Sequence, residues 1–506
     1  MLYRITSAAL HGIEAYPVDV EVDICAGFPT FVTVGLPDAA VRESKERVRA
    51  ALKNCGYDLE SKRITINLAP ADRRKEGSAF DLPIALGFLA FLEVAPAPRL
   101  RDFLFVGELA LDGRLKPVRG VLPIALMARR AGFQGIVVPG ANAREAALVR
   151  ELEVFALEDL VRVVRLLREP GAVAPCRFDE RELVAPADYP VDFEDVKGQQ
   201  HAKRALEVAA AGSHNVLLVG PPGAGKTMLA RRLPTILPDL SYEEMLEVTR
   251  VYSAAGLLAG TGPIASRPFR APHHTATDAG LIGGGQVPKP GEVSLAHHGL
   301  LFLDELPEFK RRVLEDLRQP VEDGRVTVVR SGYSVTFPAA FMLVAAMNPC
   351  ADVRRGLLGK DAGCTESEKA RYYSKISGPL LDRIDIQLEV PEVKFGDIVS
   401  RTPAECSAAI RTRVTRARDK QTARFYGRRI FANAQMGPKE VKLFCRLPPE
   451  AETILEMAVT KLGFSARAYD RVLKVARTIA DLEGVEAIET PHVSEAIQYR
   501  MMDRLR

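Results

Sequence analysis

The stretch VLLVGPPGAGKT, Val216 to Thr227, decides the fold of this chain. Four apolar residues that suit a buried strand lead into a glycine-rich loop of the form GxxxxGK followed by Thr, and a helical pattern comes next. Glycines let backbone N–H groups approach phosphates, the lysine reaches the β and γ phosphates, and the last hydroxyl is a ligand for Mg²⁺. The stretch therefore predicts a site for ATP and Mg²⁺. The predicted contacts are Gly220, Gly223, Ala224, Gly225, Lys226, Thr227 and Met228.

Two later apolar runs end in polar residues that ATP hydrolysis needs. Leu300–Leu303 is followed by Asp304 and Glu305, and the run 341–347 is followed by Asn348. A carboxylate can hold Mg²⁺, its neighbour can activate water, and a neutral amide can orient that water or sense the γ-phosphate. Alone, the acids would suit a solvated loop and the Asn-Pro step a turn. With the phosphate loop upstream, we predict Asp304 as the metal ligand, Glu305 as the base and Asn348 as the sensor.

Arginines downstream are candidates for contacts with the phosphates. Arg383 lies between two acids in LLDRIDI, so an intrachain ion pair is the alternative to a finger that reaches the nucleotide of a neighbouring subunit. Arg467 and Arg471 are four residues apart, on one face of an expected helix. We predict Arg383 as the finger and Arg467 as a sensor in its own subunit, with Arg471 as the substitute.

The chain of 506 residues is long enough for about three domains. Residues 1–170 mix short β-branched runs with helical patterns and predict an α+β domain, in which Asp112-Gly113 between apolar residues predicts a hairpin. Residues 171–192 are rich in Pro and charge and predict a linker. Residues 193–393 alternate strands and helices, which predicts a parallel sheet covered on both faces. Residues 394–506 show helical patterns alone and predict a helical domain. The fold class is therefore multidomain α/β.

These residues together resemble an AAA+ ATPase of the helix-2-insert branch, with a C-terminal helical lid. The segment PFRAPHHTATDAGLIGGGQVPKPGEVSLAHHG resembles magnesium-chelatase-like ATPases, and nearly the whole chain resembles the bacterial YifB/ComM family. The resemblance implies a homohexameric, ATP-driven DNA motor, with helicase or branch-migration activity on single-stranded or branched DNA in natural transformation. The alternatives are a chelatase-like motor that remodels a protein partner and a chaperone-like remodeller.

The first domain resembles the proteolytic domain of Lon through KEGSAFDLPIAL, Lys75–Leu86, and through a second stretch that begins at Gly107. Lon-type catalysis needs a serine nucleophile and a lysine, and the resemblance puts Ala79 and Leu122 at those two places. We therefore predict no peptidase activity and expect the Ser78 hydroxyl to cap the following helix. The similar domain of the recombination ATPase RadA also lacks the dyad and serves DNA binding and ring assembly, so the resemblance implies an assembly platform with a basic surface that faces DNA.

Two features are candidate DNA surfaces. Residues 324–336 alternate as two strands around an Arg-Ser-Gly tip, and a basic tip suits a phosphate backbone. The run from Arg411 to Arg429 has eight basic residues and the single acid Asp419. The basic runs 45–49 and 73–75 permit a DNA-facing surface on the first domain. In each case the alternative is an ordinary solvated surface.

The rest of the composition limits compartment and cofactors. The net charge is +4, and no apolar run is long enough to span a membrane, so we expect a cytoplasmic protein without membrane contact. The seven scattered cysteines suggest reduced thiols. Family members often carry two cysteine pairs after the sensor, whereas only Cys350 and Cys364 stand here, so no zinc is expected. The His pairs at 273–274 and 297–298 should point to opposite faces of extended chain, which argues against a metal site.

Overall fold

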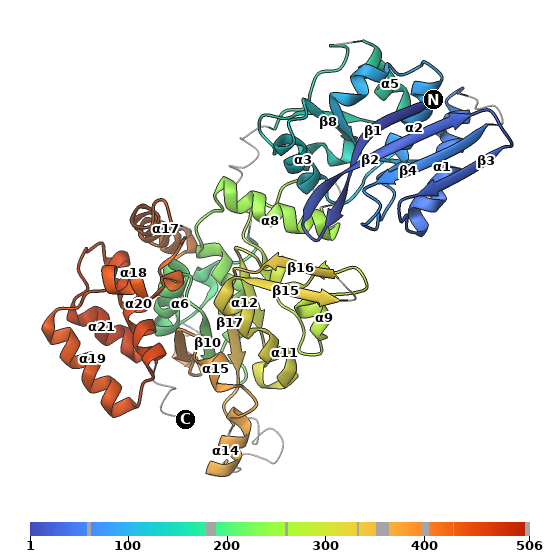
Figure 1. Ribbon diagram of the computed structural model, residues 1–506. Coiled ribbons are helices and arrows are strands. Elements are labelled where there is room, and N and C mark those ends of the chain that lie inside the picture. Colours follow the sequence, from blue (N-terminus) through green and yellow to red (C-terminus); the bar gives the residue numbers. More distant parts are fainter. Residues whose placement is uncertain are drawn as a thin grey trace. The chain divides into compact units, whose positions relative to one another are not determined.

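The computed structural model describes residues 1–57, 62–169, 171–178, 189–258, 262–330, 333–350, 364–393, 395–396, 404–428 and 430–500. The chain forms two compact units, and Figure 1 labels their helices and strands. Unit 1 comprises Met1–Ala185 together with Ser241–Ala265, and unit 2 comprises Pro186–Leu240 together with Ser266–Arg506. The second segment of unit 1 therefore interrupts the sequence of unit 2.

Unit 1 is built on two small sheets. The four-stranded sheet has the order β1-β2-β4-β3, with β3 parallel to β4 and the other pairs antiparallel. The three-stranded sheet has the order β5-β8-β9 and is parallel. Every second residue of β2 is buried, as the period of a strand with one covered face requires. The strands are β1 (Leu2–His11), β2 (Glu14–Cys25), β3 (Thr30–Val34), β4 (Arg63–Ala69), β5 (Phe103–Phe105), β6 (Glu108–Leu109), β7 (Leu115–Lys116), β8 (Gly135–Pro139) and β9 (Glu153–Leu157).

The helices of unit 1 pack on these sheets. α2 contacts β1 and β2 and is apolar on nearly every side, which explains why ten of its eleven residues are buried. Asp81 is the one charged residue of α2, and it is buried. Its Oδ2 accepts a hydrogen bond from Arg47 Nε at 2.6 Å. Burial raises the pKa of Asp81 to about 6. The helices are α1 (Ala39–Asn54), α2 (Asp81–Phe91), η1 (Ala97–Arg101), α3 (Val121–Arg130), η2 (Gly140–Asn142), α4 (Ala143–Ala146), α5 (Leu160–Arg168) and α8 (Tyr242–Ala255).

The helix α8 belongs to unit 1 although it follows the phosphate loop in sequence. It packs against α3. Ser253 Oγ of α8 donates to Glu145 Oε2 at 2.5 Å and accepts from the amide of Leu122 at 3.3 Å. Burial raises the pKa of Glu145, and these hydrogen bonds act against that shift. The segment 241–265 lies within the range 193–393 that the sequence predicted as one domain, so the predicted range and the compact units differ here.

Unit 2 contains a five-stranded parallel sheet of the order β11-β14-β17-β10-β18. The central strands are apolar throughout and fully buried, as parallel strands with both faces covered should be. We call the two ends of this sheet its carboxyl edge and its amino edge, after the strand ends that lie there. The strands are β10 (Val216–Val219), β11 (Phe269–Arg270), β14 (Leu300–Leu303), β17 (Met342–Met347) and β18 (Ile386–Glu389). The predicted parallel sheet is confirmed.

Most of the remaining elements of unit 2 are helical. They are η4 (Phe193–Asp195), α6 (Gln200–Gly212), α7 (Lys226–Arg232), η5 (Leu233–Ile236), α9 (Asp278–Leu281), α10 (Glu292–Leu295), η6 (Leu306–Glu308), α11 (Arg311–Asp316), α12 (Arg318–Asp323), α14 (Glu366–Tyr373), α15 (Gly378–Leu381), α17 (Ser407–Arg424), η7 (Asn433–Gln435), α18 (Pro438–Phe444), α19 (Pro449–Leu462), α20 (Ala466–Glu483) and α21 (Thr490–Gln498). In Figure 1 the helices α17 to α21 gather beside α6. Both α17 and α20 contact α6, and one apolar core joins these helices to the sheet.

Among the described residues, three two-stranded hairpins stand apart from the larger sheets. β6 and β7 pair antiparallel around the loop that contains Asp112-Gly113, so the hairpin predicted there is confirmed. β15 (Arg325–Arg330) and β16 (Tyr333–Pro338) pair antiparallel from Arg325↔Pro338 to Arg330↔Tyr333, which confirms the second predicted hairpin. Its tip, residues 331–332, lies outside the described residues. The short strands β12 (Gly283–Gly284) and β13 (Lys289–Pro290) form the third hairpin.

Candidate nucleotide-binding site

The phosphate loop leaves β10 at the carboxyl edge of the sheet and leads into α7. A side chain at Gly220 would place its Cβ 2.1 Å from the carbonyl oxygen of Val390, so only glycine allows the end of β18 to approach this closely. Gly225 has a φ of 89°, in the left-handed region that glycine adopts without strain. The sequence therefore keeps the loop tight where it turns into α7, and its backbone N–H groups can face a phosphate.

Lys226 lies inside the loop rather than on the surface, with 7% of the residue exposed. Its ammonium group donates to the carbonyl oxygens of Gly220 and Pro221, at 2.6 and 2.8 Å. It also donates to Oδ1 of Asn348 at 2.9 Å, across to the end of β17. The structure thus brings together the predicted lysine and the predicted sensor, 122 residues apart in sequence.

Thr227 and Asp304 meet at the next position along this edge. Thr227 Oγ1 donates to Oδ2 of Asp304 at 2.7 Å. A hydroxyl and a carboxylate oxygen at this separation fit the ligands that Mg²⁺ takes beside a nucleotide, because the ion prefers oxygen ligands and usually keeps several waters. Both residues predicted to hold the metal are therefore placed together.

Glu305 stands beside this pair. Its φ is 52°, uncommon for a residue with a side chain, and its amide donates to Asp304 Oδ1 at 3.0 Å. Its carboxylate Oε2 lies 3.4 Å from Nδ1 of His274, which follows β11 at the same edge. The predicted base is thus held by a histidine that the sequence alone did not connect with it. The two residues meet because they follow β11 and β14, which pair in parallel.

The predicted arginines lie at the opposite edge. Arg471 pairs with Asp385, which precedes β18, and the amide of Asn215, which precedes β10, donates to Asp385 Oδ2 at 3.1 Å. The phosphate loop begins after Val219, so the length of β10 separates the two sites by about 13 Å. The structure therefore does not bring Arg471 to the phosphate loop of its own subunit.

Arg383 shares the amino edge with Arg471. Its guanidinium pairs with Glu322 of α12, and its NH1 donates to the carbonyl of Pro379 at 2.7 Å. Burial lowers the pKa of Arg383, and the positive charges of Arg467, Arg318 and Arg471 lower it further. Arg467, the predicted sensor in the same subunit, is thus near enough for its charge to act on the predicted finger. Arg383 thus makes an intrachain ion pair, which the sequence offered as the alternative to a finger, but its partner is Glu322 rather than an acid next to it in sequence.

This arrangement can be compared with known proteins. The competence protein ComM of Haemophilus influenzae is 44% identical over 502 residues, which cover 99% of this chain and 97% of ComM. The protein YifB of Escherichia coli is 44% identical over the same shares of both chains. The chain belongs to the YifB/ComM family of magnesium-chelatase-like ATPases. The expected family is thereby confirmed.

Three family descriptions cover most of this YifB/ComM member. Residues 192–398 match magnesium chelatase, subunit ChlI; residues 20–142 match subunit ChlI of Mg-chelatase; and residues 404–500 match its C-terminal part. The magnesium-chelatase 67 kDa subunit of Chlorobaculum parvum is 30% identical over 173 residues, 34% of this chain and 25% of that subunit. This family implies an AAA+ ATPase that uses a nucleotide and Mg²⁺. No helix among the described residues is long and apolar enough to cross a membrane.

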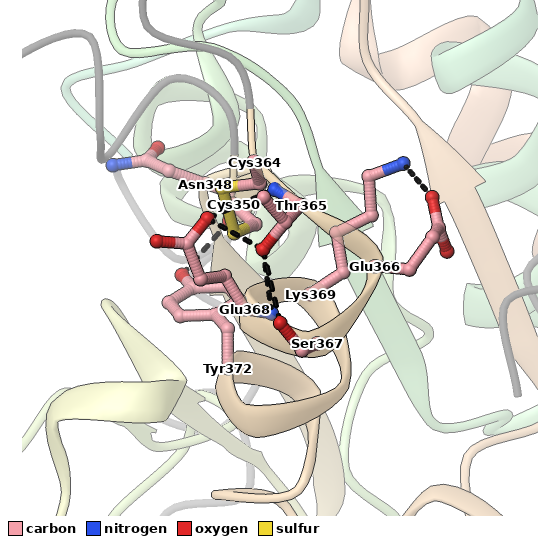
Figure 2. The surroundings of a disulfide bond; sticks show 9 residues. All are labelled: Asn348, Cys350, Cys364, Thr365, Glu366, Ser367, Glu368, Lys369 and Tyr372. Atoms are coloured by element: carbon pink, nitrogen blue, oxygen red, sulfur yellow. Dashed lines mark hydrogen bonds and ion pairs between the residues drawn. A yellow bond between two sulfur atoms is a disulfide. The ribbon is translucent and has the colours of Figure 1, made fainter.

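A disulfide bond lies next to the sensor of this YifB/ComM member. Cys350 and Cys364 are bonded, with their Cα atoms 6.4 Å apart, so the prediction of reduced thiols is wrong for this pair (Figure 2). Two neighbouring elements bring them together. Cys350 follows Asn348 at the end of β17, Cys364 precedes α14, and the hydroxyl of Tyr372 on α14 donates to the carbonyl of Asn348 at 2.9 Å. The expectation of no zinc remains a prediction.

The basic run from Arg411 to Arg429 is mostly paired within the protein. Its guanidinium groups bind acids and carbonyls that are distant in sequence, so the run holds α17 against the rest of unit 2. The contacts are Arg411 with Asp239, Arg413 with Glu207 and Glu405, Arg418 with the carbonyls of Ala210 and Ala211, Arg424 with Asp481, and Arg428 with Glu440. Arg416 and Lys420 are exposed, and Arg429 lies outside the described residues.

Some residues of the basic runs 45–49 and 73–75 also make contacts within unit 1. Lys75 is fully buried, and its ammonium group donates to the carbonyl of Pro70. Arg73 lies over the ring of Tyr16, 4.9 Å from its centroid. Ser78 does not cap α2, because its hydroxyl donates to Glu108, so the predicted cap is wrong.

The histidine pairs differ from expectation. The rings of His273 and His274 have centroids 4.1 Å apart, and those of His297 and His298 are 3.9 Å apart, so the members of a pair do not point to opposite faces. Both pairs lie in turns rather than in extended strands, which is why the alternation of a strand does not apply.

Proposed function

We propose that this chain is an ATP-driven motor that assembles as a homohexameric ring in the cytoplasm and moves single-stranded or branched DNA during transformation or recombination. The observation that carries this proposal is the separation of the site into two halves. The phosphate loop and the acids lie on the carboxyl edge of the sheet, whereas the predicted arginines lie on the amino edge. An ATPase divided in this way is complete only where the carboxyl edge of one subunit meets the amino edge of the next.

Hydrolysis in this arrangement follows from the contacts at the carboxyl edge. Lys226 would exchange its carbonyl partners for the β and γ phosphates. Thr227 and Asp304 would hold Mg²⁺, which would supply charge neutralisation beside the phosphates. Glu305 takes the proton of the attacking water. Asn348, which already faces Lys226, positions that water or senses the γ-phosphate.

Arg383 would reach the γ-phosphate held by a neighbouring subunit and stabilise the charge of the transition state. Because Arg467 is near enough for its charge to act on Arg383, we propose that Arg467 also acts on the neighbour, in place of the role in its own subunit that the sequence predicted. Asp385 already holds Arg471, which supports a positioning role for that residue.

The hairpin β15–β16 is the DNA contact that we propose. Arg325 and Arg330 are exposed on it, and Val329 is 67% exposed. An exposed basic hairpin suits a phosphate backbone that passes through a ring. The paired run on α17 supports this choice, because most of its charge is already neutralised. That one relative is named a competence protein fits a DNA substrate.

The N-terminal domain, residues 1–170, would serve as an inactive Lon-like platform for assembly. Leu122 is fully buried, its amide bonds to Ser253 of α8, and Ala79 has no nucleophile. A peptidase role is therefore unsupported. Casein degradation in the presence of ATP would contradict this part of the proposal.

ATP hydrolysis measured while DNA is added tests the proposed function. The wild type is titrated with single-stranded, duplex and four-way-junction DNA, and Glu305→Gln supplies the blank. Strong stimulation by single-stranded or junction DNA is expected. Normal basal hydrolysis without stimulation by any DNA would contradict the DNA substrate.

The second candidate function is remodelling of a protein partner by a chelatase-like motor. The similarity to the chelatase subunit over 173 residues favours it. Stimulation of hydrolysis by an unfolded protein, with none by DNA, would replace the first candidate with this one.

A further inference from the structure

The amino edge contains one more arginine than the sequence pointed to. Arg318 and Glu322 are four residues apart on α12 and therefore lie on the same helix face. Glu322 pairs with Arg383, which places Arg318 next to that guanidinium. Together with Arg467 and Arg471 on α20, these arginines form a group that we call the arginine cluster.

The arginine cluster has more positive charge than the described acids around it can neutralise. In the part of the chain that the structure describes, its ion pairs use Glu322 and Asp385 alone. Asp385 also accepts from the amide of Asn215, and His214 Nδ1 lies 3.3 Å from it. Glu322 and Asp385 pair with Arg383 and Arg471, whereas Arg318 and Arg467 have no ion pair among the described residues. Gathering like charges at a partly buried position costs stability unless an anion binds there.

Two hydrogen-bond donors of the arginine cluster also have no acceptor among the described residues. The Nε atoms of Arg383 and Arg471 are buried and have no hydrogen-bond partner among the described residues. A buried donor without a partner destabilises the folded chain. Burial lowers the pKa of Arg383, and the charges of Arg467 and Arg318 lower it further, which agrees with uncompensated charge. The cluster is therefore prepared for a ligand with several negative oxygens.

We propose that Arg318 is a further phosphate-binding arginine, which acts with Arg383 on the nucleotide held by the neighbouring subunit. The inference rests on the proposed ring. A γ-phosphate in transfer spreads charge over three oxygens, and planar guanidinium groups match such oxygens in pairs. Within one subunit, Arg318 lies at the amino edge and is separated from the phosphate loop by the length of β10.

The first test compares Arg318→Ala with Arg311→Ala by steady-state ATP hydrolysis. Arg311 is the matched control, because it is an exposed arginine of α11 whose Nε lies 3.2 Å from Glu315 Oε1 of its own helix. We expect Arg318→Ala to lower kcat at least about 10-fold and to leave KM nearly unchanged, because removal of a transition-state donor acts on kcat. Arg318→Lys, which keeps the charge without the planar fork, should lose less. It also serves as the test if the alanine variant does not fold. An unchanged kcat in both would overturn the proposal.

The second test asks which subunit uses Arg318. Arg318→Ala is mixed with Lys226→Ala, which has no working phosphate loop but keeps Arg318. Rings that contain both variants should regain hydrolysis, because some interfaces combine an intact loop with an intact Arg318. The mixture of Arg383→Ala with Lys226→Ala is the reference. If the reference regains activity and the Arg318 mixture does not, the role of Arg318 is wrong. If neither regains activity, the proposed ring site itself is wrong.

Discussion

The two edges of the parallel sheet in unit 2 are built from similar polar groups but are balanced differently. At the carboxyl edge, Lys226 faces Asn348 and Thr227 faces Asp304, at 2.9 and 2.7 Å. At the amino edge, two carboxylates pair with Arg383 and Arg471, and the buried Nε atoms of these two arginines have no hydrogen-bond partner among the described residues. The polar groups named at the carboxyl edge have partners within one chain, whereas some donors and charges at the amino edge have none among the described residues. An edge with unmet donors and excess charge indicates where a second molecule completes the structure.

The largest effect should follow from removing the base at the carboxyl edge. Glu305→Gln keeps the shape of the side chain but cannot accept a proton, so hydrolysis should fall by about 10²–10⁴-fold while ATP still binds. Binding of a fluorescent ATP analogue and steady-state hydrolysis measure the two properties. Glu308→Gln is the control, because Glu308 lies on η6 and pairs with Lys375 at 3.2 Å. An equal loss of ATP hydrolysis in Glu305→Gln and Glu308→Gln would contradict the role of Glu305 as the base.

A large change in stability is expected at the amino edge. Asp385 has 1% of its surface exposed and is the anion for Arg471, so Asp385→Asn should lower the free energy of unfolding by about 3–5 kcal/mol. Chemical denaturation measures it, with the exposed Asp419→Asn as control.

The loss of stability in Asp385→Asn should also depend on pH. Burial alone would raise the pKa of Asp385, but the charge of Arg471 and the hydrogen bond with His214 bring it below the ordinary value of 3.8. A carboxyl group whose pKa is lowered by folding stabilises the folded state at pH values above its pKa in the unfolded chain. This stabilisation is lost as the pH falls through the lowered pKa. The difference between wild type and Asp385→Asn should therefore shrink below about pH 4. A difference that grows there would contradict this assignment.

A smaller effect is expected from the contact between His274 and Glu305. If this contact holds the base away from its water, His274→Ala should raise basal hydrolysis by up to about five-fold, the equivalent of one hydrogen bond of about 1 kcal/mol. His273→Ala is the control, since His273 Nδ1 lies 2.9 Å from Thr275 Oγ1 instead. A lower rate in His274→Ala would mean that the histidine supports the base.

The disulfide beside Asn348 should have the smallest effect on hydrolysis. Tyr372 independently holds the main chain of Asn348, so reduction should leave the rate nearly unchanged. Labelling of thiols in denatured protein should find five of the seven cysteines without reductant and all seven with it. Seven labelled thiols without reductant would show that the pair is reduced.

The sequence predicted what is encoded locally. The phosphate loop is one continuous stretch, and Asp304, Glu305 and Asn348 directly follow apolar strands whose carboxyl ends must meet at one edge of a parallel sheet. Spacing and strand type were therefore enough to place these residues together.

Contacts between distant segments could not be read in the same way. Arg383 pairs with Glu322 rather than with its neighbours in sequence, and Arg411–Arg429 finds acids such as Asp481 that no spacing relates to it. The helix α8 joins unit 1 through Ser253, 108 residues from its partner Glu145. Such pairs depend on how elements pack, which local periodicity does not specify.

The most direct test of the divided site is hydrolysis by mixtures of Arg383→Ala and Lys226→Ala, each nearly inactive alone. Our account predicts that activity returns in the mixture, with a maximum at intermediate ratios, because an intact phosphate loop then meets an intact Arg383 across a subunit interface. Mixtures that stay inactive at every ratio, while sedimentation shows that both variants assemble together, would contradict it.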